Sequence, residues 1–130
     1  MRTDSLRRID SFPYRHRVAE LMSTPLVSAL PEATVAEVSR LMSEQGISSV
    51  VTVDQQGHPS GILTERDILR IVATDPARLS LQVGEVMSSP VHTVGAGALA
   101  YRAIGRMSRH GVRHLAVVDD DGRAVGMLTA

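Results

Sequence analysis

The sequence predicts an α+β fold built from two similar units. The first observation is an internal duplication, since residues 18–64 match residues 83–129 at a constant shift and without a gap. The second is a common order of predicted elements in the two copies: helix, strand, helix, strand, strand. The third is composition, because 130 residues of which 43% are hydrophobic suffice for a compact domain with its own core.

The duplication is carried by residues with specific backbone or packing roles. Methionine, proline, glycine, aspartate and threonine recur at the same offset in both copies. The matched pairs are Met22/Met87, Pro25/Pro90, Met42/Met107, Gly46/Gly111, Asp54/Asp119, Gly57/Gly122, Gly61/Gly126 and Thr64/Thr129. Two copies are too few for a solenoid. They predict a pair of units that are related by a pseudo-twofold axis and share one core.

Each copy begins with a short predicted helix, at residues 18–22 and 83–87, followed by a Ser-x-Pro segment. The residue before a proline disfavours the helical conformation, so the chain is expected to be extended over residues 25–29 and 90–94. An amphipathic helix follows in each copy. In the first copy its apolar residues at helical spacing are Val35, Val38, Leu41 and Met42.

Glycine ends this second helix in both copies, at Gly46 and Gly111, where a left-handed C-terminal cap is expected. Two β-rich runs come next, joined by "DQQG" in the first copy and "DDDG" in the second, which predicts a hairpin. A last helix, from Thr64 to about Ala73, completes the first copy. The β-rich runs are residues 48–53 and 60–63, and residues 113–118 and 124–128.

Composition argues against several classes of protein. The formal net charge is zero, with 14 basic and 14 acidic residues, so no global field favours nucleic acid or an anionic membrane. The absence of cysteine excludes disulfides, thiolate nucleophiles and zinc–thiolate sites. The basic N-terminus lacks the apolar stretch of a signal peptide, and no run approaches the roughly 18 apolar residues of a membrane span. These features predict a cytoplasmic location and no membrane partner.

Aromatic residues are nearly absent. The chain has only Phe12, Tyr14 and Tyr101, so its core is expected to be aliphatic. A protein that binds single-stranded nucleic acid usually offers aromatic side chains on which bases stack. Nucleic-acid binding is therefore not expected.

Three motifs, repeated in order, resemble those of the CBS domain, and the tandem resembles a CBS pair (a Bateman module). They are the Met-Ser-x-Pro segments, "GISSVVTVD" with "GVRHLAVVD", and "GILTERD" at residues 61–67. The resemblance covers about residues 18–130. It implies two βαββα units packed about a pseudo-twofold axis, with two clefts between them. It also implies regulation in place of catalysis: sensing AMP, ADP, ATP or a relative such as S-adenosylmethionine, with no required cofactor.

The resemblance divides the chain into four segments. We expect a lead-in over residues 1–17, a first repeat over 18–73, a linker over 74–82 and a second repeat over 83–130. The second repeat stops at "GMLTA", where the first continues into its final helix. We expect either that the chain is a fragment of a longer signalling protein or that the ordered part ends here, with a partner chain covering the apolar surface.

A homodimer is also expected. The helical segments "EVSRLMSEQ" and "LAYRAIGRM" offer more apolar surface than one small core needs, and CBS pairs usually associate. The effector that such a module would control is not named by the sequence. A ligand-independent dimerisation module therefore stands as the alternative to a ligand sensor.

Thr64 and Asp67 form a T-x-x-D motif at the start of the predicted final helix. Spacing alone predicts a capping box, with Thr64 as N-cap and Asp67 in the first turn. The resemblance implies a second role, in which Asp67 accepts hydrogen bonds from the ribose hydroxyls of a ligand and Thr64 lies close by. A carboxylate can accept from both hydroxyls of a cis-diol, so the two interpretations are compatible.

Arg113 and His114 begin the central strand of the second copy. Spacing alone allows charged residues at an exposed strand end, whereas the resemblance implies contact with a ligand phosphate in the cleft that holds Asp67. The first copy has the uncharged Ser48 and Ser49 at these positions, so the other cleft is expected to be empty or weaker. The remaining predicted lining residues of the stronger cleft are Ile62, Val91, His92, Val112 and Ala116.

The sequence does not favour two other kinds of site. "GAGALA" at residues 95–100, with Asp119 about 20 residues on, fits a dinucleotide-binding fingerprint, but the matching segment "LPEATV" has no glycine. His110 and His114 are four residues apart, but Gly111 interrupts the helix between them and no third metal ligand is evident. The basic lead-in is expected to be a solvated arm or a docking segment.

Overall fold

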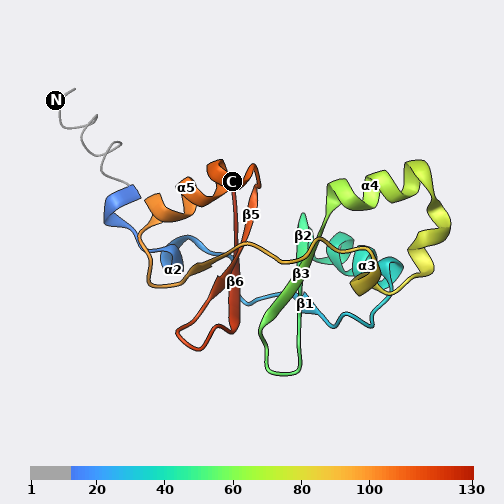
Figure 1. Ribbon diagram of the computed structural model, residues 1–130, viewed down its shortest axis with the longest axis horizontal. Coiled ribbons are helices and arrows are strands. Elements are labelled where there is room, and N and C mark those ends of the chain that lie inside the picture. The colour runs from blue at the N-terminus through green and yellow to red at the C-terminus, as the bar shows by residue number, and fades with distance from the viewer. Residues whose placement is uncertain (1–12) are drawn as a thin grey trace. The chain divides into compact units, whose positions relative to one another are not determined.

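The computed structural model describes residues 13–130, which form two compact units. We call residues 27–91 the central unit, and residues up to Leu26 together with His92–Ala130 the terminal unit. Each unit contains one three-stranded mixed sheet, covered by helices (Figure 1). The predicted α+β class, with one small sheet for each copy of the duplication, is confirmed.

The central unit has the sheet order β1-β2-β3, with β1 parallel and β3 antiparallel to β2. Helix α3 packs beside this sheet, and α4 continues directly from β3. The buried core is aliphatic and comprises Val35, Val38, Met42, Val50, Leu63, Ile71 and Val83. The elements are β1 (Ser28–Ala29), α3 (Val35–Gln45), β2 (Ser49–Val53), β3 (Pro59–Thr64), α4 (Glu65–Thr74), and the 3-10 helices η1 (Pro76–Ser80) and η2 (Val83–Glu85).

The terminal unit repeats this arrangement, with the sheet order β4-β5-β6, β4 parallel to β5 and β6 antiparallel to it. Its core residues are Val18, Val94, Ala103, Leu115 and Val117. No aromatic side chain from residues 13–130 belongs to either buried cluster. The elements are α2 (Val18–Leu21), β4 (Thr93–Gly95), α5 (Ala100–His110), β5 (His114–Val118) and β6 (Ala124–Thr129).

The predicted caps and turns are confirmed. Gly46 and Gly111 have φ of 64° and 63°, the left-handed conformation that glycine adopts without a steric penalty. The connections "DQQG" and "DDDG" each join two antiparallel strands. The short helix predicted over residues 83–87 is a 3-10 helix of three residues instead. Gly84 in this segment is a weak helix former, and the segment needs a glycine there because a Cβ would lie only 3.1 Å from the Cβ of Pro31.

The first segment of each repeat packs on the sheet of the other repeat. In the terminal unit Ser23 bridges Met127 of β6, and in the central unit Ser88 bridges Ile62 of β3. The backbone hydrogen bonds of the two units match at the shift of the duplication. For example, the Val18 amide donates to Ala98 at 2.8 Å, and the amide of Val83 to Ala33 at 2.7 Å. The structural units are therefore offset from the sequence repeats by one short segment.

Within residues 13–130, no helix is both long enough and apolar enough to cross a membrane. The first twelve residues of the predicted lead-in lie outside the described part of the chain. The rest of the lead-in packs on the terminal unit, where the amide of Ala100 donates to the carbonyl of His16 at 2.9 Å.

Candidate functional site

Thr64 is both the last residue of β3 and the N-cap of α4. Its backbone is extended, with φ −114° and ψ 164°, so its side chain can fold back over the first turn of the helix. The amide of Asp67 donates to the Thr64 Oγ1 at 3.3 Å. In return the Thr64 amide donates to the Asp67 Oδ2 at 2.9 Å. The capping box that the spacing predicts is confirmed.

The Asp67 carboxylate keeps one oxygen outside this cap. Both hydrogen bonds that it accepts, from the amide and from the hydroxyl of Thr64, end on Oδ2 at 2.9 Å. Oδ1 accepts none from residues 13–130. Asp67 is half-buried, and so is Thr64. One carboxylate can therefore cap the helix with Oδ2 and accept hydrogen bonds from a ligand with Oδ1.

The surroundings of this pair in the central unit are fixed by backbone contacts. The amide of Glu65 donates to the carbonyl of Ser48 at 2.9 Å, which joins the start of α4 to the residue before β2. Ile62 is half-buried and exchanges two backbone hydrogen bonds of 3.0 Å with Ser88. Val91, also half-buried, is the last residue of the unit.

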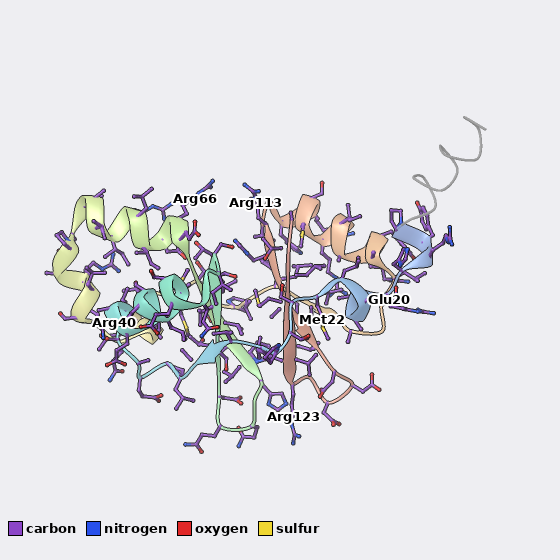
Figure 2. The ribbon with its side chains drawn as sticks, turned by 180° about the vertical axis from the view of Figure 1, so that it is seen from behind. Glu20, Met22, Arg40, Arg66, Arg113 and Arg123 are labelled. Atoms are coloured by element: carbon purple, nitrogen blue, oxygen red, sulfur yellow. The ribbon has the colours of Figure 1, made fainter. Side chains whose placement is uncertain are left out.

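In the terminal unit, His114 is the first residue of β5 and Arg113 directly precedes it. Arg113 is exposed (Figure 2), and its guanidinium makes no hydrogen bond or ion pair within the described part of the chain. His114 is half-buried and is paired across the sheet with Thr129. The His114 Nδ1 lies 3.2 Å from the Thr129 Oγ1. The terminal-unit threonine thus contacts an imidazole where the central-unit Thr64 contacts a carboxylate.

Three more predicted lining residues lie in the terminal unit. Val112 is half-buried and packs against the core of this unit. Ala116 is fully buried in the middle of β5, and its amide donates to the carbonyl of His92 at 3.1 Å. His92 itself lies just before β4 and is half-buried. All of these contacts lie within the terminal unit. The lining of the cleft therefore stays a prediction.

Sequence reasoning missed the pairing of His92 with His110. Their rings are stacked, with centroids 4.1 Å apart and an interplanar angle of 17°. The two residues are 18 positions apart, and only the packing of the end of α5 beside the start of β4 brings them together. No periodicity in the sequence signals such a contact.

The metal alternative gains no support from these histidines. Among the described residues, no group of three or more His, Cys, Asp or Glu side chains is arranged to bind a metal ion. His110 stacks on His92, and His114 contacts Thr129. The two histidines that the sequence places four residues apart therefore have different neighbours.

The glycine-rich segment gives the dinucleotide alternative no support. In a phosphate-binding loop the backbone amides point at the ligand. Here the amide of Ala96 donates to Val118 at 2.8 Å, that of Ala98 to Gly95 at 3.1 Å, and that of Ala100 to His16. Three amides within residues 96–100 thus already donate to protein carbonyls.

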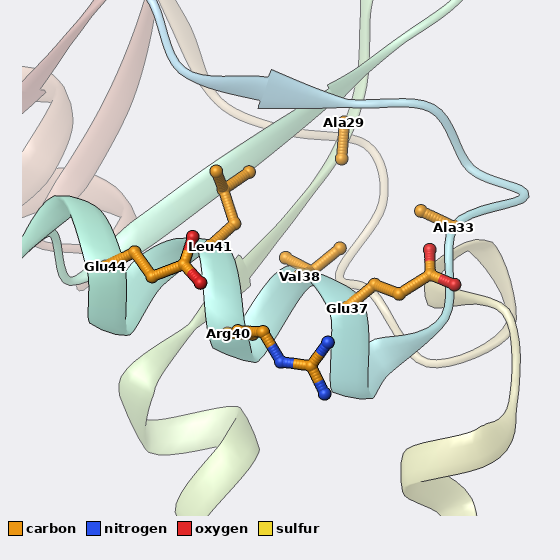
Figure 3. A pocket seen from close by; sticks show the side chains of 7 residues that line it. All are labelled: Ala29, Ala33, Glu37, Val38, Arg40, Leu41 and Glu44. Atoms are coloured by element: carbon orange, nitrogen blue, oxygen red, sulfur yellow. The ribbon is translucent and has the colours of Figure 1, made fainter.

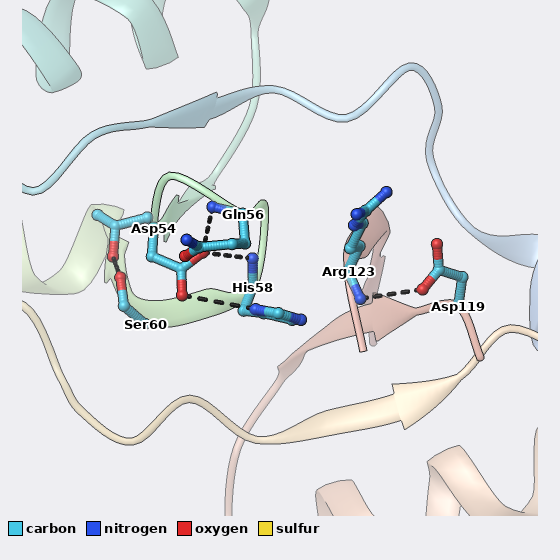
Figure 4. A network of polar contacts seen from close by, with 7 residues as sticks. Asp54, Gln56, His58, Ser60, Asp119 and Arg123 are labelled. Atoms are coloured by element: carbon cyan, nitrogen blue, oxygen red, sulfur yellow. Dashed lines mark hydrogen bonds and ion pairs between the residues drawn. The ribbon is translucent and has the colours of Figure 1, made fainter. Parts of the chain in front are cut away.

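Asp119, the acidic residue of that fingerprint, serves the β5–β6 turn instead. Its Oδ1 accepts a hydrogen bond from the amide of Arg123 at 3.0 Å (Figure 4) and another from the amide of Asp121 at 2.9 Å. Asp54 makes the same pair of contacts in the other unit, with Gln56 and His58. The hydrogen bond from the His58 amide is the main cause that lowers the pKa of Asp54 below its usual value of 3.8.

A groove of about 320 Å³ lies elsewhere in the central unit, beside α3 (Figure 3). It contains none of the predicted ligand-binding residues. Its lining residues are Ala29, Ala33, Glu37, Val38, Arg40, Leu41 and Glu44.

Each unit has a mixed three-stranded sheet, and the first segment of each repeat packs on the sheet of the other repeat. This arrangement defines a tandem α+β module. The chain belongs to the CBS domain family, whose profile matches residues 18–74 and 83–130. The resemblance inferred from the motifs is confirmed.

Solved structures of CBS pairs share this fold. The CBS domain protein PAE2072 from Pyrobaculum aerophilum, complexed with AMP, is 32% identical with a TM-score of 0.79, covering 88% of this chain and 87% of that one. The CBS domain pair of protein MJ0100, in complex with 5-methylthioadenosine and S-adenosyl-L-methionine, is 25% identical with a TM-score of 0.79. It covers 88% of this chain and 89% of that one.

Two curated relatives are longer proteins. An uncharacterized protein of Methanopyrus kandleri is 34% identical over 113 residues, which is 86% of this chain and 58% of that protein. Inosine-5'-monophosphate dehydrogenase of Mycobacterium leprae is 37% identical over 109 residues, 83% of this chain but 20% of the enzyme. The similarity therefore covers a minor part of that enzyme and carries no catalytic activity over to this chain.

Proposed function

We propose that this chain is a regulatory module that binds an adenosine-containing ligand, of which AMP, ADP and ATP are the primary candidates. The observation that carries the proposal is the Asp67 carboxylate, which caps α4 through Oδ2 and leaves Oδ1 for the ribose hydroxyls. The adenosine compounds bound by two CBS pairs of the same fold support it. The module needs no cofactor and performs no catalysis, and we place it in the cytoplasm.

The phosphate end of the ligand is assigned to Arg113 and His114. A guanidinium binds phosphate oxygens with two parallel hydrogen bonds, and that of Arg113 has no partner within residues 13–130. The equivalent residues of the central unit, Ser48 and Ser49, carry no charge, and Ser49 is buried. We therefore propose one strong binding site, with Ile62, Val91, His92, Val112 and Ala116 as the remaining residues near the ligand.

Asp67→Asn tests the ribose contact while retaining an acceptor oxygen for the helix cap. We expect AMP affinity, measured by isothermal titration calorimetry, to fall about 10- to 150-fold, because a hydrogen bond to a charged group contributes about 1.5–3 kcal/mol. Glu65→Gln, in the same helical turn, is the matched control and should bind AMP like the parent. Parental affinity in Asp67→Asn would contradict the assignment.

The second candidate is a ligand-independent interaction module. It is favoured by the terminal unit, where Thr129 contacts His114 in place of an aspartate. A thermal-shift screen separates the two functions. If AMP, ADP, ATP, S-adenosylmethionine and 5-methylthioadenosine at millimolar concentration all leave the melting temperature unchanged, the ligand-sensing proposal fails.

A further inference from the structure

Two methionines lie at equivalent places in the two units. Met87 lies against Gly61 of β3, where a Cβ would be 2.7 Å from the methionine Cγ. Met22 lies against Gly126 of β6, where a Cβ would be 2.7 Å from the methionine Sδ (Figure 2). Each methionine belongs to the segment that packs on the sheet of the other repeat. Both side chains are half-buried, so both are partly open to small oxidants.

The polar surroundings of the two sulfur atoms differ. The Thr52 hydroxyl donates to the Met87 Sδ at 3.0 Å and lies 2.8 Å from the Ser60 Oγ. At the shift of the duplication, Thr52 and Ser60 correspond to Val117 and Val125, which have no hydroxyl. The methionine of the central unit therefore has a hydrogen-bond donor beside its sulfur, whereas the terminal unit has valine in the same place.

The contacts of Met22 include no such donor. Its Sδ accepts no hydrogen bond from residues 13–130. Val117 is fully buried and pairs with Gly126 across β5 and β6. The carbonyl oxygen of Ser23 also approaches this glycine, at 3.0 Å from the Cβ position, but a carbonyl can only accept. The amides of Ser23 and Met127 already donate to each other's carbonyls, at 2.8 and 3.3 Å.

We propose that Met22 is a site of oxidation to methionine sulfoxide, and that this oxidation loosens residues 18–26 from β6. A peroxide supplies the oxygen atom: its O–O bond breaks, an S=O bond forms on the thioether, and water or an alcohol leaves. The sulfur loses two electrons, which the peroxide gains. The segment that carries the N-terminal lead-in would thus respond to oxidants.

The new oxygen has a different consequence in each unit. A sulfoxide oxygen is a hydrogen-bond acceptor on a side chain that was apolar before. At Met87 the hydroxyl of Thr52 can donate to it. At Met22 it lies beside Val117 and the Ser23 carbonyl, and a buried acceptor without a donor destabilises the contact that buries it. The same reaction is therefore tolerated in the central unit and disruptive in the terminal unit.

Hydrogen peroxide, added to the full chain, tests the proposal. Mass spectrometry of peptides measures the oxidation of each methionine, and amide hydrogen exchange by NMR measures the stability of each contact. In the parent we expect exchange at Ser23 and Met127 to rise about 5- to 150-fold, the factor that corresponds to an unpaired buried acceptor. Exchange at Ser88 and Ile62, the equivalent pair of the central unit, should stay close to that of the untreated chain.

Two leucine variants assign the effect to one sulfur atom. Met22→Leu removes the sulfur and nearly keeps the volume, so peroxide should leave exchange at Ser23 and Met127 unchanged. Met107, another half-buried methionine of the terminal unit, is still open to oxidation in this variant. Met87→Leu is the matched control and should respond to peroxide like the parent.

Thr52→Val tests the role of the hydroxyl, and it keeps the proposal testable if Met22→Leu does not fold. This variant gives the central unit the valine that the terminal unit has. Peroxide should then raise exchange at Ser88 and Ile62 as well.

Three results would overturn the proposal. They are a Met22 that is oxidised no faster than Met42, whose side chain is only 3% accessible, a Met22→Leu variant whose exchange still rises with peroxide, and a Thr52→Val variant whose central-unit pair does not respond. None of these measurements uses a nucleotide, so their outcome is independent of the proposed ligand binding.

Discussion

At the scale of single residues, Asp54 shows how one carboxylate shapes a turn. Its Oδ1 accepts hydrogen bonds from the amides of Gln56 and His58, both 2.9 Å long. The hydrogen bond from His58 lowers the pKa of Asp54 in the folded chain relative to its value of 3.8 in a model compound. Folding therefore favours the ionised form of this side chain.

The sign of the pH dependence follows from that shift. A depressed folded pKa contributes stability that is present above the unfolded pKa and is lost as the pH falls through the folded pKa. We expect Asp54→Asn, which keeps the acceptor oxygen, to lose less stability than the parent between pH 5 and pH 2.5. Urea unfolding at the two pH values measures this. Asp120→Asn, whose carboxylate accepts no hydrogen bond in the described structure, should lose as much as the parent.

The contact between Thr64 and Asp67 is the part of the candidate site that could be predicted from the sequence. The spacing predicts the capping box, and the structure confirms it, because an N-cap and its partner at N3 are local contacts. Spacing cannot predict which carboxylate oxygen the cap uses. That depends on the side-chain rotamer, which leaves Oδ1 of Asp67 outside the cap.

At the scale of elements, close contacts between glycine and methionine attach each exchanged segment to its sheet. A Cβ built on Gly61 of β3 would lie 2.7 Å from the Cγ of Met87, and one on Gly126 of β6 would lie 2.7 Å from the Sδ of Met22. In the central unit the buried hydroxyl of Thr52 also donates to the Met87 Sδ at 3.0 Å. The paired recurrence of Met and Gly in the two copies thus has a packing cause.

Gly61→Ala tests this contact. We expect a loss of about 1–3 kcal/mol in the free energy of unfolding, because the added methyl group overpacks the site. In a double-mutant cycle, Met87→Ala should make the same glycine substitution much less costly. Gly105→Ala, in open space on α5, is the control and should stabilise by about 0.5–1 kcal/mol. Additive effects of Gly61→Ala and Met87→Ala would contradict the contact.

Most elements could be predicted from the sequence, but their partners could not. Hydrophobic periodicity and the left-handed glycines fix α3 and α5, because these are properties of the local chain. The exchange of residues 18–26 and 83–91 between the sheets is not local. The match of residues 18–64 with 83–129 shows that these two segments are equivalent. It does not show which sheet each segment packs on, because the match is the same for either arrangement.

At the scale of the whole molecule, the formal net charge is zero, but the charged residues are divided unevenly between the two units. In the described residues, the terminal unit has seven Arg against four acidic residues, and the central unit has four Arg against eight. The sequence total cannot reveal this, because the terminal unit is assembled from both ends of the chain. An anionic group is therefore favoured near the terminal unit, where the exposed Arg113 lies just before β5.

If Arg113 contacts the ligand phosphate, Arg113→Ala should weaken AMP binding in calorimetry by about tenfold or more, since a hydrogen bond to a charged group is lost. Adenosine, which has no phosphate, should bind the variant and the parent equally. Raising the ionic strength should weaken AMP binding to the parent in the same direction, because salt screens exposed charges.

Arg123→Ala is the matched control for this prediction, since it removes an exposed guanidinium from the same unit at the β5–β6 turn (Figure 2). AMP affinity should be unchanged in this variant. A mere effect of net charge would weaken AMP equally in both variants, and a structural effect of Arg113→Ala would weaken adenosine as well. Either outcome would remove Arg113 from the phosphate end of the ligand and leave the ribose contact of Asp67 to be judged by its own titration.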